Sequence, residues 1–146
     1  MGIITKYPKK AHVQLTPSFN SNEFDCPCNR DSCKETLIDL DHVKKLQKLR
    51  DDLNAPIHID SATRCLEHNT EVGGEPHSQH MLGHATDIKV VSMTPDEVAD
   101  ACEGFDGLGR YNTFTHVDSR GSKARWDFRT KPKVKESDVS VSDKDL

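Results

Sequence analysis

Two segments of the chain alternate between apolar and polar positions, a pattern that predicts β-strands. In residues 85–91, ATDIKVV, the alternation places Asp87 on the face opposite to Thr86, Ile88 and Val90. Residues 114–119, FTHVDS, alternate in the same way and place His116 and Asp118 on one shared face. The sequence therefore predicts two strands that each carry acidic or imidazole side chains on one face.

Apolar residues recur at helical spacing in two other segments. One runs from about Thr36 to Asn54 and ends before Pro56. The other begins at Thr94, which fits an N-cap followed by proline and a capping-box Glu97, and it runs to about Cys102. Shorter predicted elements are a helical turn at 19–24, strands at 57–61 and 124–128, a loop at 66–77, and a hairpin joining 107–111 to 114–119.

The composition fits one small domain. The chain has 146 residues, of which 34% are hydrophobic and 30% charged, so we expect a modest core and a highly polar surface. Residues 1–18 are expected to form an extended lead-in to a domain at 19–130. Residues 131–146 mix both charge signs and have no large aromatic side chain, which predicts a disordered polar tail.

Charge and hydropathy argue against two classes of partner. The formal net charge of −4 gives no reason to expect nucleic-acid binding. No apolar run approaches the roughly 18 residues that a membrane span needs. The first residues, MGIITKYPKKAHV, lack the apolar stretch of a signal peptide. We therefore expect a protein that binds neither nucleic acid nor a membrane. We also expect a monomer.

The segment 78–87 concentrates the chemistry of the chain. It reads S-x-H-x-x-G-x-A-x-D, with His80 and Asp87 as an imidazole and a carboxylate that both suit a divalent metal. The small residues Gly83 and Ala85 between them let the backbone turn closely. We expect His80 on a loop beside the strand that carries Asp87.

A third ligand is expected from the second strand. If residues 114–119 pair antiparallel with 85–91, His116 faces Asp87 across the sheet. His80, Asp87 and His116 then form a set of two histidines and one carboxylate. Three protein ligands with a position left for water are typical of a catalytic zinc site rather than of a closed structural one.

The ordered motif SxHxxGxAxD with a later HxD resembles the zinc peptidases that cut peptidoglycan peptides. These are the D-Ala-D-Ala carboxypeptidases and related endopeptidases, whose fold is shared with the hedgehog signalling domain. The resemblance runs from about residue 19 to 126 and includes SFNSNEFDCPC, LDHVKKLQKLRDDL, SATRC and GLGRYNTFTHVDSRGSKARW. It implies an α+β fold with a small antiparallel sheet and flanking helices, and one catalytic Zn²⁺.

The resemblance also implies residues that bind substrate. An arginine in the turn after the 57–61 strand contacts the substrate carboxylate or the polarised carbonyl in such enzymes, so Arg64 is the candidate here. The alternative is a surface arginine in a salt bridge. Ser78 is the candidate for anchoring the motif, through a hydrogen bond to backbone near His80, and for lining the substrate site.

The residue at the expected position of the general base departs from the family pattern. Many members carry a carboxylate three residues before the last histidine ligand, but this chain has Thr113 there, which cannot act as a base. Asp118, on the same strand face as His116, is our candidate. The alternative for Asp118 is a group that orients a ligand or binds Arg120. Asp106 is the remaining candidate.

Five cysteines leave three interpretations open. Cys26, Cys28 and Cys33 are close in sequence, and Cys65 and Cys102 complete the set. They could supply a second, structural metal site built on Cys26, Cys28 and Cys33, or a disulfide such as one to Cys65, or reduced thiols packed as small apolar groups.

Taken together, the residues and the resemblance predict a zinc-dependent hydrolase that cuts peptide bonds of the peptidoglycan stem peptide. The expected setting is a small phage-type endolysin, cytoplasmic until its release or phage-associated, which acts on the cell wall. Two alternatives are a non-catalytic, zinc-bearing module like the hedgehog domain and a phage structural protein that reuses the fold.

Overall fold

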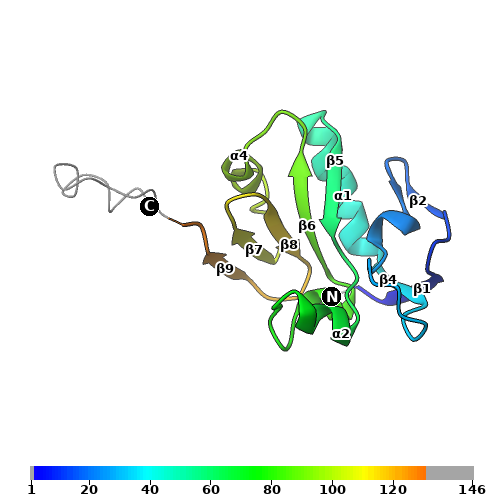
Figure 1. The fold of residues 1–146 in the computed structure, drawn as a ribbon. Helices are drawn as coiled ribbons and strands as arrows, with labels where there is room; N and C mark the ends of the chain where they lie inside the picture. The colour runs from blue at the N-terminus through cyan, green and yellow to red at the C-terminus, as the bar shows by residue number, and fades with distance from the viewer. Residues whose placement is uncertain (1, 131–146) are drawn as a thin grey trace.

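The computed structural model describes residues 2–130 and has an α+β fold, as predicted (Figure 1). Its main sheet has five strands in the order β5-β6-β8-β7-β9, and two further sheets have two strands each. The predicted tail at 131–146 lies outside the described residues. The strands of the main sheet are β5 (Ile57–Ser61), β6 (Ala85–Val90), β7 (Gly107–Arg110), β8 (Thr115–Asp118) and β9 (Ala124–Asp127).

The centre of the main sheet has the predicted register. β6 and β8 pair antiparallel with Asp87 opposite His116. β7 and β8 form the expected antiparallel hairpin. β9 completes the sheet at its edge, where it runs parallel to β7. Because the two central strands pair directly, the side chains of Asp87 and His116 stand next to each other on one face.

The long helix begins later than predicted. Residues Glu35–Asp39 form strand β4, which pairs with β1 (Ile4–Pro8), and α1 runs from Leu40 to Leu53. The side chain of Asp39 accepts a hydrogen bond from the backbone N–H of His42 and caps α1. Helical spacing of the apolar residues hid the short strand, in which Ile38 is buried.

The residues expected to form an extended lead-in are extended but paired. In addition to β1, they contain β2 (Gln14–Thr16), which pairs with β3 (Phe19–Asn20). The lead-in therefore packs on the rest of the molecule as two edge strands. β1, β2 and β4 lie at the opposite end of the molecule from β9 (Figure 1). The start of the peptidase domain at residue 19 stays a prediction.

The predictions for the shorter helices are only partly confirmed. The helical turn η1 (Ser21–Phe24) is confirmed, and so is α4 (Pro95–Asp100), with its capping box between Thr94 and Glu97. The expected loop at 66–77 instead begins with helix α2 (Leu66–Glu71). The thiol of Cys65 accepts a hydrogen bond from a backbone N–H of α2, and a sulfur cap gives no usual sequence signal.

One apolar core joins α1 to the main sheet. Val43 and Leu46 of α1 lie in the same buried cluster as Ile59, Ile88 and Val117 of the sheet. In Figure 1, α1 lies behind β5 and β6. Within residues 2–130, no helix is long and apolar enough to span a membrane.

A buried histidine fixes α1 against the strands that carry the candidate site. His42 Nδ1 lies 2.7 Å from the hydroxyl of Ser119, and Nε2 lies 3.0 Å from the hydroxyl of Thr86. Burial lowers the pKa of His42 to about 3, because a protonated imidazole would lose its hydration there. His42 is therefore a neutral polar bridge between the helix and the sheet.

This bridge predicts a pH dependence of stability. The unfolded chain protonates His42 below about pH 6.5, whereas the folded protein resists protonation down to about pH 3. The free energy of unfolding should therefore fall as the pH drops through this window, by at most about 1.4 kcal/mol per pH unit from this residue. Urea denaturation of the wild type and His42→Leu from about pH 7 to about pH 4 measures the difference.

The variant should be less stable near neutral pH, because the hydroxyls of Thr86 and Ser119 lose a partner, but it should lose less stability on acidification. His58→Ala changes an exposed histidine and should follow the wild type. Equal slopes for the wild type and His42→Leu would contradict the assignment.

Candidate metal centre

Three elements bring the predicted ligands together. Asp87 comes from β6, His116 from β8 and His80 from the short helix α3 (Gln79–Leu82). His80 Nε2 and His116 Nδ1 lie 3.2 and 3.0 Å from the same carboxylate oxygen, Oδ1 of Asp87. All three ligand atoms lie within 4.8 Å of one another, and all three residues are buried. The structure thus brings together the three residues that the sequence singled out, and their role as metal ligands stays a prediction.

The turn that presents His80 is a helix rather than the expected loop. The hydroxyl of Ser78 accepts a hydrogen bond from the backbone N–H of His80 at 3.1 Å, as anticipated for the anchor of the motif. Gly83 ends α3 with φ +83°, a left-handed conformation that favours glycine. A Cβ atom at Gly83 would also lie 2.8 Å from Cβ of Leu37. Ser78 therefore caps the start of α3, and Gly83 turns the chain sharply from the end of α3 toward β6, which carries Asp87.

The second nitrogen of each histidine has its own partner. His80 Nδ1 donates to the carbonyl oxygen of Ala62 at 2.8 Å. His116 Nε2 donates to the carboxylate of Asp118 at 2.7 Å. These bonds fix both rings and direct His80 Nε2 and His116 Nδ1 at Asp87. Two imidazole nitrogens and one carboxylate oxygen therefore converge, a donor set that suits Zn²⁺.

The electrostatics of the cluster favour a bound cation. Burial lowers the pKa of His80, so its imidazole is held neutral as a metal ligand requires. Burial also acts to lower the pKa of His116, but the carboxylates of Asp118 and Asp87 outweigh burial and raise it. Burial acts to raise the pKa of Asp87, yet its bonds to His116 and His80 hold that pKa well below its usual range. A cation between these groups can replace the proton that the carboxylates attract to His116.

Asp118 lies behind His116 rather than in the open site. Its side chain is fully buried, and Arg120 donates to both carboxylate oxygens, at 2.9 and 2.7 Å. Asp118 contacts Nε2 of His116, the ring nitrogen that points away from Asp87. The general-base role of Asp118 stays a prediction. These contacts favour the alternative, a group that orients His116 and binds Arg120. Asp106, the remaining candidate for the general base, accepts a hydrogen bond from the backbone N–H of Gly121.

Arg64 stands beside the cluster, as predicted. Its guanidinium donates to Asp87 Oδ2 at 3.2 Å, to Ser61 at 3.2 Å and to Asn69 at 3.3 Å. The side chain is only 14% exposed, so three acceptors fix the direction of a positive charge next to the candidate metal site.

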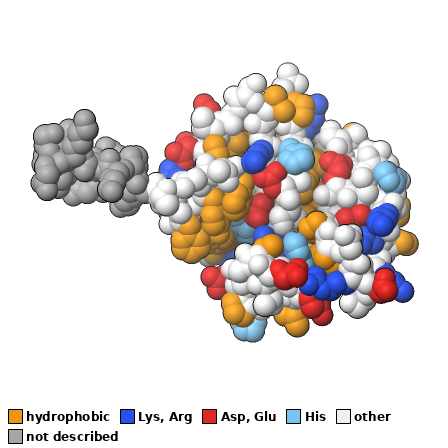
Figure 2. All heavy atoms as spheres, viewed as in Figure 1, with side chains coloured by type: hydrophobic (Ala, Val, Ile, Leu, Met, Phe, Trp, Pro, Cys, Tyr) orange, Lys and Arg blue, Asp and Glu red, His pale blue; other side chains and the backbone are white. Residues whose placement is uncertain are grey.

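A cleft of about 460 Å³ opens over these residues. One wall is aromatic: the ring of Tyr111 stacks on Phe114 at 4.4 Å and meets Phe128 edge-on. Trp126 donates from Nε1 to the hydroxyl of Tyr111 and lies against the ring of His116. In Figure 2, hydrophobic side chains gather on the side of the molecule where β9 lies.

Two elements expected from the sequence contribute to this cleft. Trp126 of the expected strand at 124–128 lines it, and so do Glu75 and His77 of the segment 66–77. The sequence did not single out the aromatic residues at 111, 114 and 128. Their signal was weak, because they belong to two separate segments that meet only when β9 pairs with β7.

The family of the chain follows from its sequence. Residues 17–118 match the family model Peptidase M15, a span of more than half of the 146 residues. The chain belongs to the M15 peptidase family. All three candidate ligands, Arg64 and Asp118 of this M15 chain lie within the matched span. No curated protein matches the chain. The predicted resemblance is thus confirmed at the level of the family.

The cluster predicts a zinc content that depends on its histidines. His80→Ala and His116→Ala should each remove about one equivalent of zinc, because only two protein ligands remain. Inductively coupled plasma mass spectrometry of protein purified without added metal measures this. His58→Ala alters an exposed histidine outside the cluster and should keep the wild-type content. Full zinc retention in both cluster variants would exclude the site.

Asp118→Asn separates the two roles considered for Asp118. If Asp118 orients His116, the variant should bind zinc about 10- to 100-fold more weakly, since the amide holds the ring less well than a carboxylate. Competition with a chromophoric chelator measures the affinity. Unchanged zinc affinity, with turnover lost at saturating zinc, would instead support Asp118 as the general base.

Proposed function

We propose that this M15 family chain is a zinc-dependent peptidase that cuts peptide bonds of bacterial peptidoglycan. The observation that supports this most is the convergence of His80, Asp87 and His116 at a cleft that Arg64 also lines. Structural zinc sites close all four positions with protein ligands, whereas this cluster offers three.

The three ligands would hold Zn²⁺ through His80 Nε2, a carboxylate oxygen of Asp87 and His116 Nδ1. Zinc bound there supplies Lewis acidity, which polarises a peptide carbonyl and lowers the pKa of a water molecule. The protein contributes the orientation of the ligands. Ala62 and Asp118 fix the two imidazole rings through their second nitrogens.

Arg64 binds the negative charge of the substrate in this proposal. Its three acceptors on the protein hold the guanidinium in place, and the cation lines the cleft beside Asp87. A fixed cation there stabilises either a substrate carboxylate or the oxygen on which charge develops during hydrolysis. Ser78 also lines the cleft and stays our candidate for a substrate contact.

We propose Glu75 as the group that takes and returns the proton. Among residues 2–130, Glu75 and Asp87 are the carboxylates that line the cleft, and Asp87 is committed to the ligand cluster. The side-chain amide of Asn69 donates a hydrogen bond to the backbone carbonyl of Glu75 and holds this part of the loop. Glu75 is exposed, so its carboxylate is free to approach a water molecule.

The walls of the cleft fit a short peptide that carries carboxylates. Tyr111, Phe114 and Phe128 offer apolar surface, while Arg64 and Arg120 offer positive charge. Stem peptides of peptidoglycan combine small apolar D-Ala side chains with free carboxylates. This chemistry and the motif resemblance support a cell-wall peptide as the substrate, and the phage-type endolysin setting remains a prediction.

Digestion of purified peptidoglycan, with mass spectrometry of the released fragments, tests the proposal. The wild type should release fragments from one type of peptide bond, and the masses identify that bond. His116→Ala and chelated wild type should release none. No release by folded, zinc-loaded wild type would favour the non-catalytic binding module or the phage structural protein instead.

Arg64 should matter more for catalysis than for folding. Arg64→Ala should lower kcat/KM by on the order of tenfold or more, because the cleft loses its fixed positive charge, while Tm changes by only a few degrees. Steady-state kinetics on a released-fragment assay and thermal denaturation measure both. Arg110→Ala removes an arginine that pairs with Asp96 and Asp100 away from the cleft, and it should keep wild-type kinetics. A variant with normal kcat/KM and a much lower Tm would show that Arg64 is structural.

A further inference from the structure

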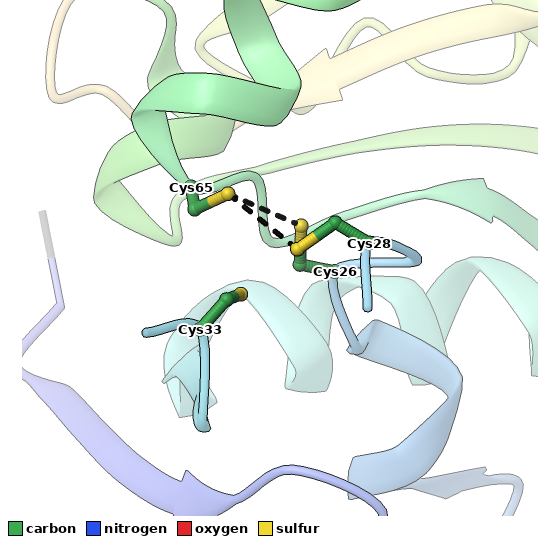
Figure 3. A group of neighbouring side chains, drawn as sticks. All are labelled: Cys26, Cys28, Cys33 and Cys65. Carbon is green, nitrogen blue, oxygen red and sulfur yellow. Dashed lines mark hydrogen bonds between the residues drawn. The ribbon is translucent and has the colours of Figure 1, made fainter. Parts of the chain in front are cut away.

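Four cysteine thiols gather outside the cleft. Cys26, Cys28 and Cys33 lie in the segment between η1 and β4, and Cys65 is the N-cap residue of α2. Figure 3 shows their sulfur atoms turned toward a common space. The Sγ atom of Cys65 lies 3.8 Å from that of Cys26 and 3.7 Å from that of Cys28, and the four Sγ atoms all lie within 4.8 Å of one another.

The two distances from Cys65 are those of neighbouring sulfur atoms around a tetrahedral metal, and all four sulfur atoms are close enough to share one ion. With Zn–S bonds of about 2.3 Å, neighbouring sulfur atoms of a tetrahedron lie about 3.8 Å apart. We propose that Cys26, Cys28, Cys33 and Cys65 form a structural zinc site, separate from the candidate catalytic centre. The three clustered cysteines left this possibility open in the sequence, and the fold adds Cys65 as the fourth ligand.

The surroundings of the cluster suit bound thiolates. Lys9 Nζ lies 3.7 Å from the sulfur of Cys28 and 3.5 Å from that of Cys33, and it also donates to the carbonyl of Cys28 at 2.6 Å. The backbone N–H of His68 donates to the sulfur of Cys65. Four thiolates around one Zn²⁺ carry a net negative charge, which the ammonium and the N–H group offset.

A metal accounts for the cluster better than a disulfide does. A disulfide uses two sulfur atoms and leaves the other two without a role, whereas Cys65 stands at nearly equal distances from Cys26 and Cys28. All five cysteines, each within the described residues, are free thiols. Cys102 differs from the four: it is buried in the apolar core, where it packs as a small hydrophobic group.

The site would stabilise the part of the cleft that holds Arg64. Cys65 directly follows Arg64 and caps α2, and α2 carries Asn69, which accepts a hydrogen bond from Arg64. A metal on Cys65 ties this connection to the segment with Cys26, Cys28 and Cys33. An effect of the cysteine site on catalysis, through the position of Arg64, rests on the proposed function. The cysteine metal site itself does not depend on that proposal.

Zinc content measured by inductively coupled plasma mass spectrometry tests the site. Cys65→Ser should bind about one equivalent less than the wild type, because the fourth ligand is lost. Cys102→Ser is the matched control, a buried cysteine outside the cluster, and should match the wild type. Unchanged zinc in Cys65→Ser, or iron in place of zinc in the wild type, would overturn the proposal.

Two measurements on the intact cluster keep the test sound if Cys65→Ser fails to fold. Replacing zinc with Co²⁺ in the wild type should give thiolate-to-cobalt charge-transfer bands, and these should persist in His80→Ala, which leaves the cysteines intact. Alkylation of the wild type in denaturant with chelator but without reductant should label all five cysteines. Labelling of only three would show a disulfide, and missing charge-transfer bands would show that the thiols bind no metal.

Loss of zinc in Cys65→Ser but not in His80→Ala would support this site and contradict the proposed catalytic zinc.

Discussion

The antiparallel pairing of β6 with β8 is the constraint on which the candidate site depends. It places Asp87 directly opposite His116, so a carboxylate and an imidazole meet on one face of the sheet without help from any loop. A shift of one residue in this register would turn the side chains of one strand to the opposite face and separate the pair. His80 then joins them because Gly83 turns the chain back into β6.

A layer of buried polar contacts supports this pairing from behind. Asp39 caps α1 and accepts a hydrogen bond from His84 Nδ1 at 2.8 Å. His42, in the first turn of the same helix, bridges to the hydroxyl groups of Thr86, near the start of β6, and of Ser119, which directly follows β8. These contacts satisfy polar groups that would otherwise be costly to bury, and they fix the helix relative to the strands. The site is thus held by the core of the fold as well as by its own residues.

The sequence predicted what short-range patterns can encode. Strand alternation gave the shared face of Asp87 and His116, and the capping box gave the start of α4. It could not give the orientation of the His116 ring, which decides that Asp118 meets the nitrogen facing away from Asp87. The fourth thiol, Cys65, lies far along the chain from the other three, so only the tertiary fold brings it to them.

Anomalous diffraction at the zinc absorption edge, from crystals of protein purified without added metal, tests the central claim most directly. The account predicts a zinc peak bound by His80 Nε2, a carboxylate oxygen of Asp87 and His116 Nδ1, with His116 Nε2 still bonded to Asp118. A peak with His116 bound through Nε2 would contradict the roles given to both residues. Absence of zinc from these three side chains in zinc-containing crystals would contradict the metal centre itself.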